Sequence, residues 1–289
     1  MAGTEADFAQ QTEARPFGMT HIIEPISEHT HTAVMLHGRG STGKEFAEDF
    51  LTSTLSDESP IHEKLPGWRW VFPSSQELWS SAFQENMPAW FGAHSLTDIT
   101  TRQDLQVSGI RDSVNHIIGM IEKEVERLDG NPQRLVLGGI SQGGAVGLWT
   151  LLCQRNSAMR PGAVVVASTW LPFAANIERA LAGHQTPGAP HESEFDLFVE
   201  QMMALKEIAG MNDVGQDSRR SCPIFIGHGI DDAYVDVALG RQAARVLAQA
   251  GLKVEWKEYS GAEEEGHWFK VPDEMDDIHR FLAHLQCIE

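Results

Sequence analysis

The sequence predicts an α/β fold in which a mostly parallel central sheet is flanked by helices. Short apolar runs alternate with amphipathic stretches along the chain, and a Gly-x-Ser-x-Gly pentapeptide joins one apolar run to a helix-compatible segment. The 289 residues suffice for one large domain, and no repeat or linker interrupts the alternation. We therefore expect a polar, patternless tail over residues 1–15 and a single domain over residues 16–289.

The first predicted strand covers the apolar run 33–36 and leads into the glycine-rich loop His37-Gly38-Arg39-Gly40. A loop in this position can present a backbone amide to an oxygen that gains negative charge. We assign that amide to Arg39. Its side chain is expected to be a solvated cation, with contact to an acidic part of a substrate as the alternative.

Residues 38–44 also satisfy most of a phosphate-binding Gly-x-x-x-x-Gly-Lys loop. A nucleotide site needs Ser or Thr at the next position to ligate magnesium, and this chain has Glu45 there. A carboxylate where phosphate charge must be held disfavours a P-loop nucleotide-binding protein.

The pentapeptide occupies residues 139–143, between the apolar run 135–137 and a helix-compatible stretch over 144–149. A strand that turns sharply into a helix at a serine exposes the hydroxyl, which makes Ser141 the candidate nucleophile. The backbone amide of the next residue, Gln142, is the second candidate donor to an oxyanion.

A serine nucleophile needs a base and a group that orients the base, and two late strands offer both. The apolar run 222–227 leads into a turn that holds three carboxylates, namely Asp231, Asp232 and Asp236. Acidic residues in turns usually have structural roles, so the residues alone leave the choice among the three open. The alternating stretch 254–259 and the loop 261–266 deliver His267 ahead of a C-terminal helix expected near Pro272, which makes His267 the candidate base.

Taken together, these motifs resemble the acyl-protein thioesterase and carboxylesterase branch of the α/β-hydrolases, also called phospholipase/carboxylesterase. Residues 36–43 look like the Leu-His-Gly-x-Gly-Asp-x-Gly loop of that family, and residues 139–145 look like its nucleophile turn. Residues 228–235 are similar to its His-Gly-x-x-Asp-x-x-Val acid loop, which selects Asp232. The resemblance thus implies an α/β-hydrolase fold with a triad of Ser141, Asp232 and His267.

Two further segments resemble the same family. Residues 87–91 match its Met-x-x-Trp-Phe motif and residues 168–172 its Ser-x-Trp-Leu-Pro motif. From these segments we expect substrate contacts at Trp90, Trp170 and Leu171.

The sequence departs from the family pattern at three motif positions and in one long segment. Gly92 and Ser41 stand where the family usually has Asp, and Asp236 stands where it has Pro. The stretch 173–220 is much longer than a compact relative would need, and residues 194–205 within it have helical periodicity. We expect a partly helical lid there, with a surface excursion as the alternative.

The resemblance implies a serine hydrolase that cleaves carboxylic esters or thioesters through an acyl-enzyme. Its substrate would be a small molecule, a lipid or an acylated protein. An acyltransferase or cyclase that uses the same triad is the alternative, because the triad alone does not determine which acceptor receives the acyl group.

Composition narrows the partners and the compartment. The formal net charge of -19 opposes binding to nucleic acid, and no segment reaches membrane-spanning length, so we expect neither nucleic acid nor stable membrane insertion. Three scattered cysteines fit a reducing, cytoplasmic setting rather than a disulfide framework. His29 and His31 flank one threonine in an expected turn, and no metal-binding spacing is evident, so neither metal nor cofactor is expected. The sequence does not decide between a monomer and a homodimer.

Overall fold

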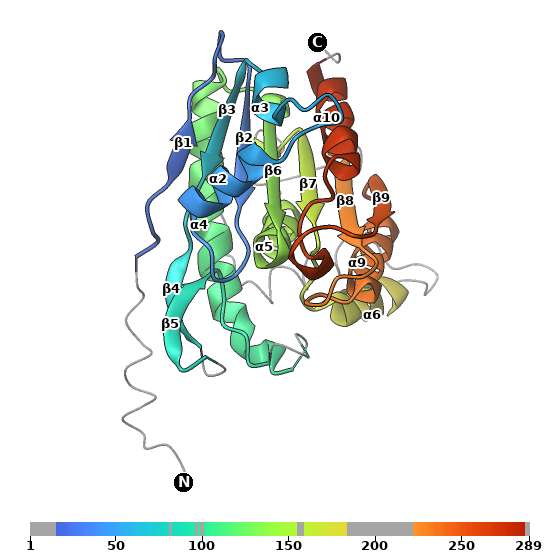
Figure 1. Cartoon of the computed structure of the whole chain (residues 1–289). Helices are drawn as coiled ribbons and strands as arrows, with labels where there is room; N and C mark the ends of the chain where they lie inside the picture. The colour runs from blue at the N-terminus through green and yellow to red at the C-terminus, as the bar shows by residue number, and fades with distance from the viewer. Residues whose placement is uncertain are drawn as a thin grey trace.

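The computed structural model describes residues 16–80, 83–95, 98, 101–154, 159–183 and 222–286. Its centre is a seven-stranded sheet in the order β1-β3-β2-β6-β7-β8-β9 (Figure 1). All neighbouring strands run parallel except β1, which is antiparallel to β3. The bounds are β1 His21–Ile23, β2 His31–Leu36, β3 Trp68–Phe72, β6 Leu135–Ile140, β7 Ala163–Ala167, β8 Ile224–Gly229 and β9 Val254–Tyr259. The predicted fold class is confirmed.

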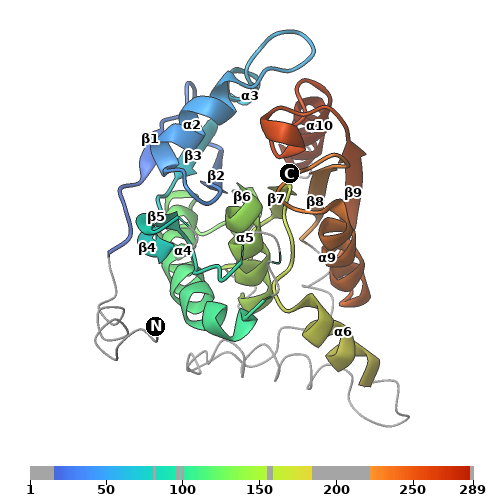
Figure 2. The ribbon, with the colours of Figure 1, turned by 60° about the horizontal axis from the view of Figure 1, so that its bottom comes forward.

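Helices cover both faces of this sheet (Figure 2). One face carries α2 Gly43–Thr52, α3 Ile61–Lys64 and α10 Asp273–Gln286, and the other carries α4 Val107–Arg127, α5 Ser141–Cys153 and α9 Val237–Gln249. Side chains of a strand point alternately to the two faces, so Ala33 and Met35 pack with the core beneath α2, whereas Val34 and Leu36 pack with the core beneath α4. Because both faces are covered, β2, β3, β6, β7 and β8 are buried throughout, which explains why most of them read as continuous apolar runs.

A separate antiparallel hairpin projects beyond the sheet (Figure 1). Its strands are β4 Gln76–Ser80 and β5 Glu85–Ala89, and it follows directly on β3. Among the described residues, the remaining elements are the helix α6 Ala174–Gly183 and the 3₁₀ turns Gln103–Gln106, Pro132–Arg134 and Glu264–Gly266.

The expected tail over residues 1–15 and the expected helix over residues 194–205 lie outside the described residues. Within the insertion 173–220, the structure describes Phe173 and α6. One expectation is wrong: His31 belongs to strand β2 rather than to a turn, where its ring stacks on Trp68 with centroids 4.9 Å apart. No described helix is long and apolar enough to cross a membrane.

Candidate active site

Ser141 stands where β6 ends and α5 begins, in a left-handed backbone conformation with φ of 53°. Such a conformation is strained for a residue with a Cβ and commonly marks a functional position. The turn requires glycine at Gly143, because a Cβ there would lie 2.3 Å from the carbonyl oxygen of Leu36. The close approach of α5 to the end of β2 therefore places Ser141 beside the glycine-rich loop.

The loops after β8 and β9 bring the two expected partners together. The Nδ1–H of His267 donates to the carboxylate of Asp232, with Nδ1 2.8 Å from Oδ2 and 3.0 Å from Oδ1. Oδ1 also accepts the backbone N–H groups of Tyr234 and Val235, at 2.9 and 2.8 Å. In a neutral imidazole this bond places the proton on Nδ1 and leaves Nε2 as the acceptor that a general base requires.

The charge of Asp232 is stabilised although its side chain has no exposed surface. Burial by itself raises the pKa of this carboxyl. The hydrogen bonds from His228, His267 and the Val235 amide outweigh that effect and hold the pKa well below its usual range. Asp232 is therefore a carboxylate at neutral pH.

The two neighbouring acids have other roles. The Oδ2 of Asp231 accepts the backbone N–H of Gly261 at 2.8 Å and so ties the loop after β8 to the loop after β9. Asp236 is the N-cap of α9, where it accepts the N–H of Ala238 at 2.8 Å. Of the three acids, only Asp232 contacts the imidazole among the described residues.

Sheet topology places the serine and the imidazole at one edge. β6, β7, β8 and β9 are consecutive parallel strands, so the loops that follow them emerge at the same edge of the sheet. The loop after β7 spans the distance between them. Thr169 Oγ1 donates to the Ser141 carbonyl at 2.7 Å, and the Ser168 N–H donates to the Gly227 carbonyl at 3.0 Å.

The buried side chain of His37 determines how the glycine-rich loop presents its amides. Its Nε2 accepts the N–H of Ser75 at 3.0 Å, so Nδ1 carries the proton and donates to the Gly38 carbonyl at 2.6 Å. In a trans peptide the carbonyl and the following N–H point in opposite directions. Fixing the Gly38 carbonyl against His37 therefore points the N–H of Arg39 away from the His37 ring. A Cβ on Gly38 would lie 3.5 Å from the Ser141 Cβ, so this peptide adjoins the serine.

The second candidate donor, the amide of Gln142, belongs to the first turn of α5. Amides in the first turn of a helix have no partner within the helix, which leaves this one available to an oxyanion. The side chain of Gln142 is buried and makes two hydrogen bonds. Its Oε1 accepts the Trp90 N–H at 2.8 Å, and its Nε2 donates to the Phe91 carbonyl at 2.7 Å.

The expected substrate contacts lie deeper than the sequence indicated. Trp90 is 0% exposed, and its indole donates to the His37 carbonyl at 2.8 Å, so in this structure it supports the glycine-rich loop from below. Trp170 and Leu171 are 7% and 3% exposed, and Trp170 packs edge-on against Phe91. Both belong to the core on the α5 side of the sheet, with little surface open to a substrate.

His228 belongs to the site but was not singled out from the sequence. It is fully buried at the end of β8, and its Nε2 lies 2.9 Å from the Val235 carbonyl and 3.4 Å from Oδ2 of Asp232. The His-Gly-x-x-Asp spacing contains a signal for His228, because a histidine four residues before the acid can contact the acid across the turn. The structure gives His228 a supporting contact with the acid.

The resemblance of residues 38–44 to a phosphate-binding loop ends at the start of α2. Thr42 and Glu45 form a capping box in which the Glu45 carboxylate accepts the Thr42 N–H at 2.9 Å and Thr42 Oγ1 accepts the Glu45 N–H at 3.2 Å. The Gly43 N–H donates to Ser74 Oγ at 2.9 Å. The amides of Thr42, Gly43 and Glu45 are therefore already bound within the chain.

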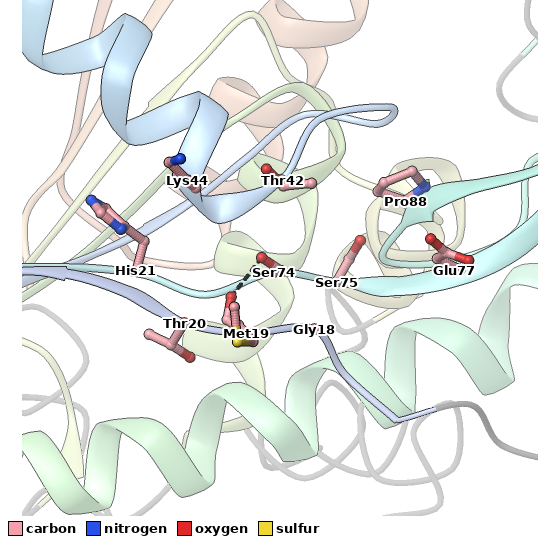
Figure 3. Close-up of a pocket in the computed structure, with 10 residues that line it drawn as sticks. All are labelled: Gly18, Met19, Thr20, His21, Thr42, Lys44, Ser74, Ser75, Glu77 and Pro88. Carbon is pink, nitrogen blue, oxygen red and sulfur yellow. Dashed lines mark hydrogen bonds between the residues drawn. The ribbon is translucent and has the colours of Figure 1, made fainter.

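A cavity of about 370 Å³ lies beside the same helix start (Figure 3). In it, the Ser74 hydroxyl donates to the Met19 carbonyl at 2.7 Å. Neither the serine turn nor the loops after β8 and β9 line this cavity, so it is separate from the candidate site. Its lining consists of Gly18, Met19, Thr20, His21, Thr42, Lys44, Ser74, Ser75, Glu77 and Pro88.

Comparison with known proteins gives a consistent family. A family model described as phospholipase/carboxylesterase matches residues 18–207. The chain is 26% identical over 265 residues to acyl-protein thioesterase 1 of Gibberella zeae, which covers 90% of this chain and 93% of the relative. It is 27% identical to a probable carboxylesterase SOBER1-like of Arabidopsis thaliana, over 78% of this chain and 69% of the relative.

Solved structures are similar in fold. The crystal structure of Zea mays acyl-protein thioesterase 2 has a TM-score of 0.63 at 22% identity and covers 93% of this chain and 99% of that one. The crystal structure of Arabidopsis thaliana SOBER1 has a TM-score of 0.63 at 23% identity, with 89% and 99% covered.

Proposed function

This chain belongs to the phospholipase/carboxylesterase family of α/β-hydrolases, and from that membership we propose that Ser141, His267 and Asp232 form its catalytic triad. The chain is a hydrolase of carboxylic esters or thioesters. The observation that carries the proposal is the Nδ1 to Oδ2 contact of 2.8 Å between the imidazole and a buried carboxylate. It supports an imidazole held in the tautomer that leaves Nε2 free to accept a proton.

The proposed reaction has two halves. Ser141 Oγ attacks the carbonyl carbon while its proton passes to Nε2 of His267, and the carbonyl oxygen becomes an oxyanion held by the Arg39 and Gln142 amides. The tetrahedral adduct collapses, the bond to the leaving group breaks, and the imidazolium gives its proton to the alcohol or thiol that departs. Water then attacks the acyl-enzyme with the same base, which releases the acid and restores the serine.

Asp232 acts on the imidazole and not on the substrate. Its carboxylate compensates the positive charge that His267 gains in each half-reaction, and it does so without itself becoming protonated. The depressed pKa of Asp232 supports this role, because a carboxyl that ionises readily stays charged throughout the cycle.

We propose acyl esters or thioesters of small molecules, lipids or proteins as substrates, since relatives of this chain are named acyl-protein thioesterase and probable carboxylesterase. The buried cysteines Cys153 and Cys222 are not joined in a disulfide, which is compatible with a reducing cytoplasm as the place of action. Hydrolysis and acyl transfer differ in the product, so mass spectrometry of the product with and without an added alcohol or thiol separates them.

The deciding experiment is labelling with a fluorophosphonate probe, which reacts with an activated serine hydroxyl. The wild type should be labelled, Ser141→Ala should not, and the surface variant Ser27→Ala should be labelled as the wild type is. Labelling that persists in Ser141→Ala would mean that another serine is the nucleophile. A series of acyl esters then measures the apolar part of the pocket, since each methylene that becomes buried contributes about 0.8 kcal/mol.

A further inference from the structure

The side chain of Arg39 is a partly buried cation that has no counter-ion among the described residues. Its Nη2 donates to Ser80 Oγ at 2.9 Å, whereas Nε and Nη1 are buried and have no hydrogen-bond partner among the described residues. Burial lowers the pKa of Arg39, and no described carboxylate opposes that effect. The sequence-based expectation of a solvated side chain is therefore wrong.

Other arginines of the chain show what a paired guanidinium looks like here. The nearly buried Arg69 contacts Glu24 and Glu124, and its Nε lies 3.1 Å from the Glu124 carboxylate. Arg241 makes two hydrogen bonds to Glu258, at 2.8 and 2.7 Å. A guanidinium withdrawn from water without such a partner costs free energy, so the arrangement at Arg39 needs another explanation.

The position of Arg39 supplies that explanation. Its own amide is the proposed oxyanion donor, and the preceding residue, Gly38, adjoins Ser141. The side chain extends from there to the end of β4, in the hairpin that a hydrogen bond of 2.8 Å from the Gly40 N–H to the Pro88 carbonyl holds against the loop. The cation therefore lies between the loop that would hold the scissile carbonyl and the hairpin next to it.

We propose that Arg39 binds a carboxylate carried by the substrate a few bonds away from the scissile carbonyl. The inference rests on the proposed function, because it takes the Arg39 amide as the oxyanion donor. An arginine side chain reaches only a short way from its own amide, so the carboxylate belongs to a short acyl group or to the near part of the leaving group. A charge at the far end of a long acyl chain would be out of reach.

The present partner of Arg39 is one that a carboxylate can replace. Ser80 Oγ is a neutral acceptor, and Arg39 shares it with the N–H of Phe83, whose nitrogen lies 3.3 Å from the same oxygen. A carboxylate offers the planar guanidinium two parallel charge-assisted hydrogen bonds, which are stronger than one to a hydroxyl. Binding would require the side chain or the hairpin to move enough to expose Nε or Nη1.

The overall charge of the chain makes a local cation informative. With a formal net charge of -19, the protein repels anionic substrates at a distance. Selection of an anionic ester must therefore come from a short-range contact, and Arg39 is placed to make it. The repulsion is screened by salt, so added salt should speed association of an anionic ester with the enzyme.

The test compares matched charged and neutral esters. On the acyl side, 4-nitrophenyl hydrogen glutarate is compared with 4-nitrophenyl pentanoate. On the leaving-group side, the butyrate ester of 4-hydroxybenzoate is compared with that of methyl 4-hydroxybenzoate. In each arm the readout is the ratio of kcat/KM for the charged ester to kcat/KM for the neutral ester. The ratio is measured in the wild type, Arg39→Gln, Arg39→Lys and Arg245→Gln. Arg245→Gln is the matched control, because Arg245 is an exposed arginine paired with Glu178.

In one arm, Arg39→Gln should lower the ratio roughly 10- to 100-fold, the range expected for a hydrogen-bonded charge pair. Arg39→Lys should lower it less, because the charge remains without the planar fork, and Arg245→Gln should leave it unchanged. The arm that responds shows which part of the substrate carries the carboxylate. The inference would be overturned if Arg39→Gln left the ratio unchanged in both arms, including the case in which it slowed charged and neutral esters equally. A wild type that hydrolyses no neutral ester and escapes the fluorophosphonate would instead overturn the proposed function.

Discussion

The side chain of Gln142 joins the serine turn to Trp90: its Oε1 accepts the backbone N–H of Trp90 at 2.8 Å. Its Nε2 completes the pair by donating to the Phe91 carbonyl at 2.7 Å. The indole of Trp90 in turn donates to the His37 carbonyl. Gln142, the residue after the proposed nucleophile, thus supports the glycine-rich loop through the segment that follows the hairpin. One side chain connects both proposed oxyanion amides.

We expect Gln142→Leu to lose both stability and activity. The leucine would leave the Trp90 N–H and the Phe91 carbonyl buried without partners, at a cost of about 1–3 kcal/mol each. Urea denaturation and kcat with a neutral ester measure the two effects. Gln249→Leu is the matched control, because Gln249 is exposed on α9. Wild-type stability in Gln142→Leu would contradict the bridging role.

The strands and the order of the site residues could be predicted because they depend on local patterns. Buried parallel strands read as apolar runs, and the proposed acid follows one of them, whereas the proposed base follows the alternating edge strand β9. The contacts of Gln142 and Arg39 could not be predicted, since each joins residues that are about 40 to 50 positions apart in the chain. The burial of Trp90 could not be predicted either. The motif identifies an aromatic residue, but its contact with His37 joins residues far apart in the chain.

Replacing Asp232 with Asn should nearly abolish activity while leaving the fold in place. Because the Tyr234 and Val235 amides require an acceptor at Oδ1, the asparagine oxygen would occupy that position and its NH₂ would face Nδ1 of His267. The imidazole would then have to carry its proton on Nε2, where it cannot accept one from Ser141. We expect a fall in kcat of about 10³- to 10⁴-fold.

The neighbouring acid provides the control for that experiment. Asp231→Asn keeps an oxygen for the Gly261 N–H and does not touch the imidazole, so its kcat should stay within a few-fold of the wild type. Thermal melting of both variants would verify that they fold. If the two variants lost activity equally, the assignment of the acid would be wrong.

The buried His37 beside the glycine-rich loop should make the protein less stable at acid pH. Burial lowers the pKa of His37 to about 4, whereas an unfolded histidine titrates near 6.5. Between these values the unfolded chain binds a proton that the folded chain does not, so stability falls as the pH drops from 6.5 to 4. The loss attributable to this residue is about 3 kcal/mol.

Urea denaturation at pH 4.5 and pH 7 measures that contribution. The difference in unfolding free energy between the two pH values should be smaller in His37→Gln than in the wild type. His284→Gln, at an exposed position on α10, should retain the wild-type difference. An unchanged difference in His37→Gln would show that other groups cause the acid sensitivity.

Glu274 should make the protein less stable as the pH rises, whereas His37 makes it less stable as the pH falls. It lies in the first turn of α10 with 2% exposure, where Oε2 accepts the Lys270 N–H at 2.9 Å and Oε1 has no partner among the described residues. Burial raises its pKa to about 8, and the nearby Asp277 adds to the shift. The folded protein therefore holds a proton that the unfolded chain has released, so the stability this group contributes at low pH is lost as the pH rises from about 4.5 to 8.

Glu274→Gln removes the titrating group but keeps an acceptor for Lys270, so its advantage over the wild type should grow by up to about 1.4 kcal/mol per pH unit between pH 5 and 8. The measurement is the unfolding free energy of both proteins across that range. Glu126→Gln, at an exposed site on α4, should follow the wild type throughout. Curves for Glu274→Gln and the wild type that stay parallel would mean that the carboxyl is already ionised in the folded protein. A Cβ on Gly227 would meet the Glu274 carboxylate, so the same site packs α10 against the strand that carries the acid loop.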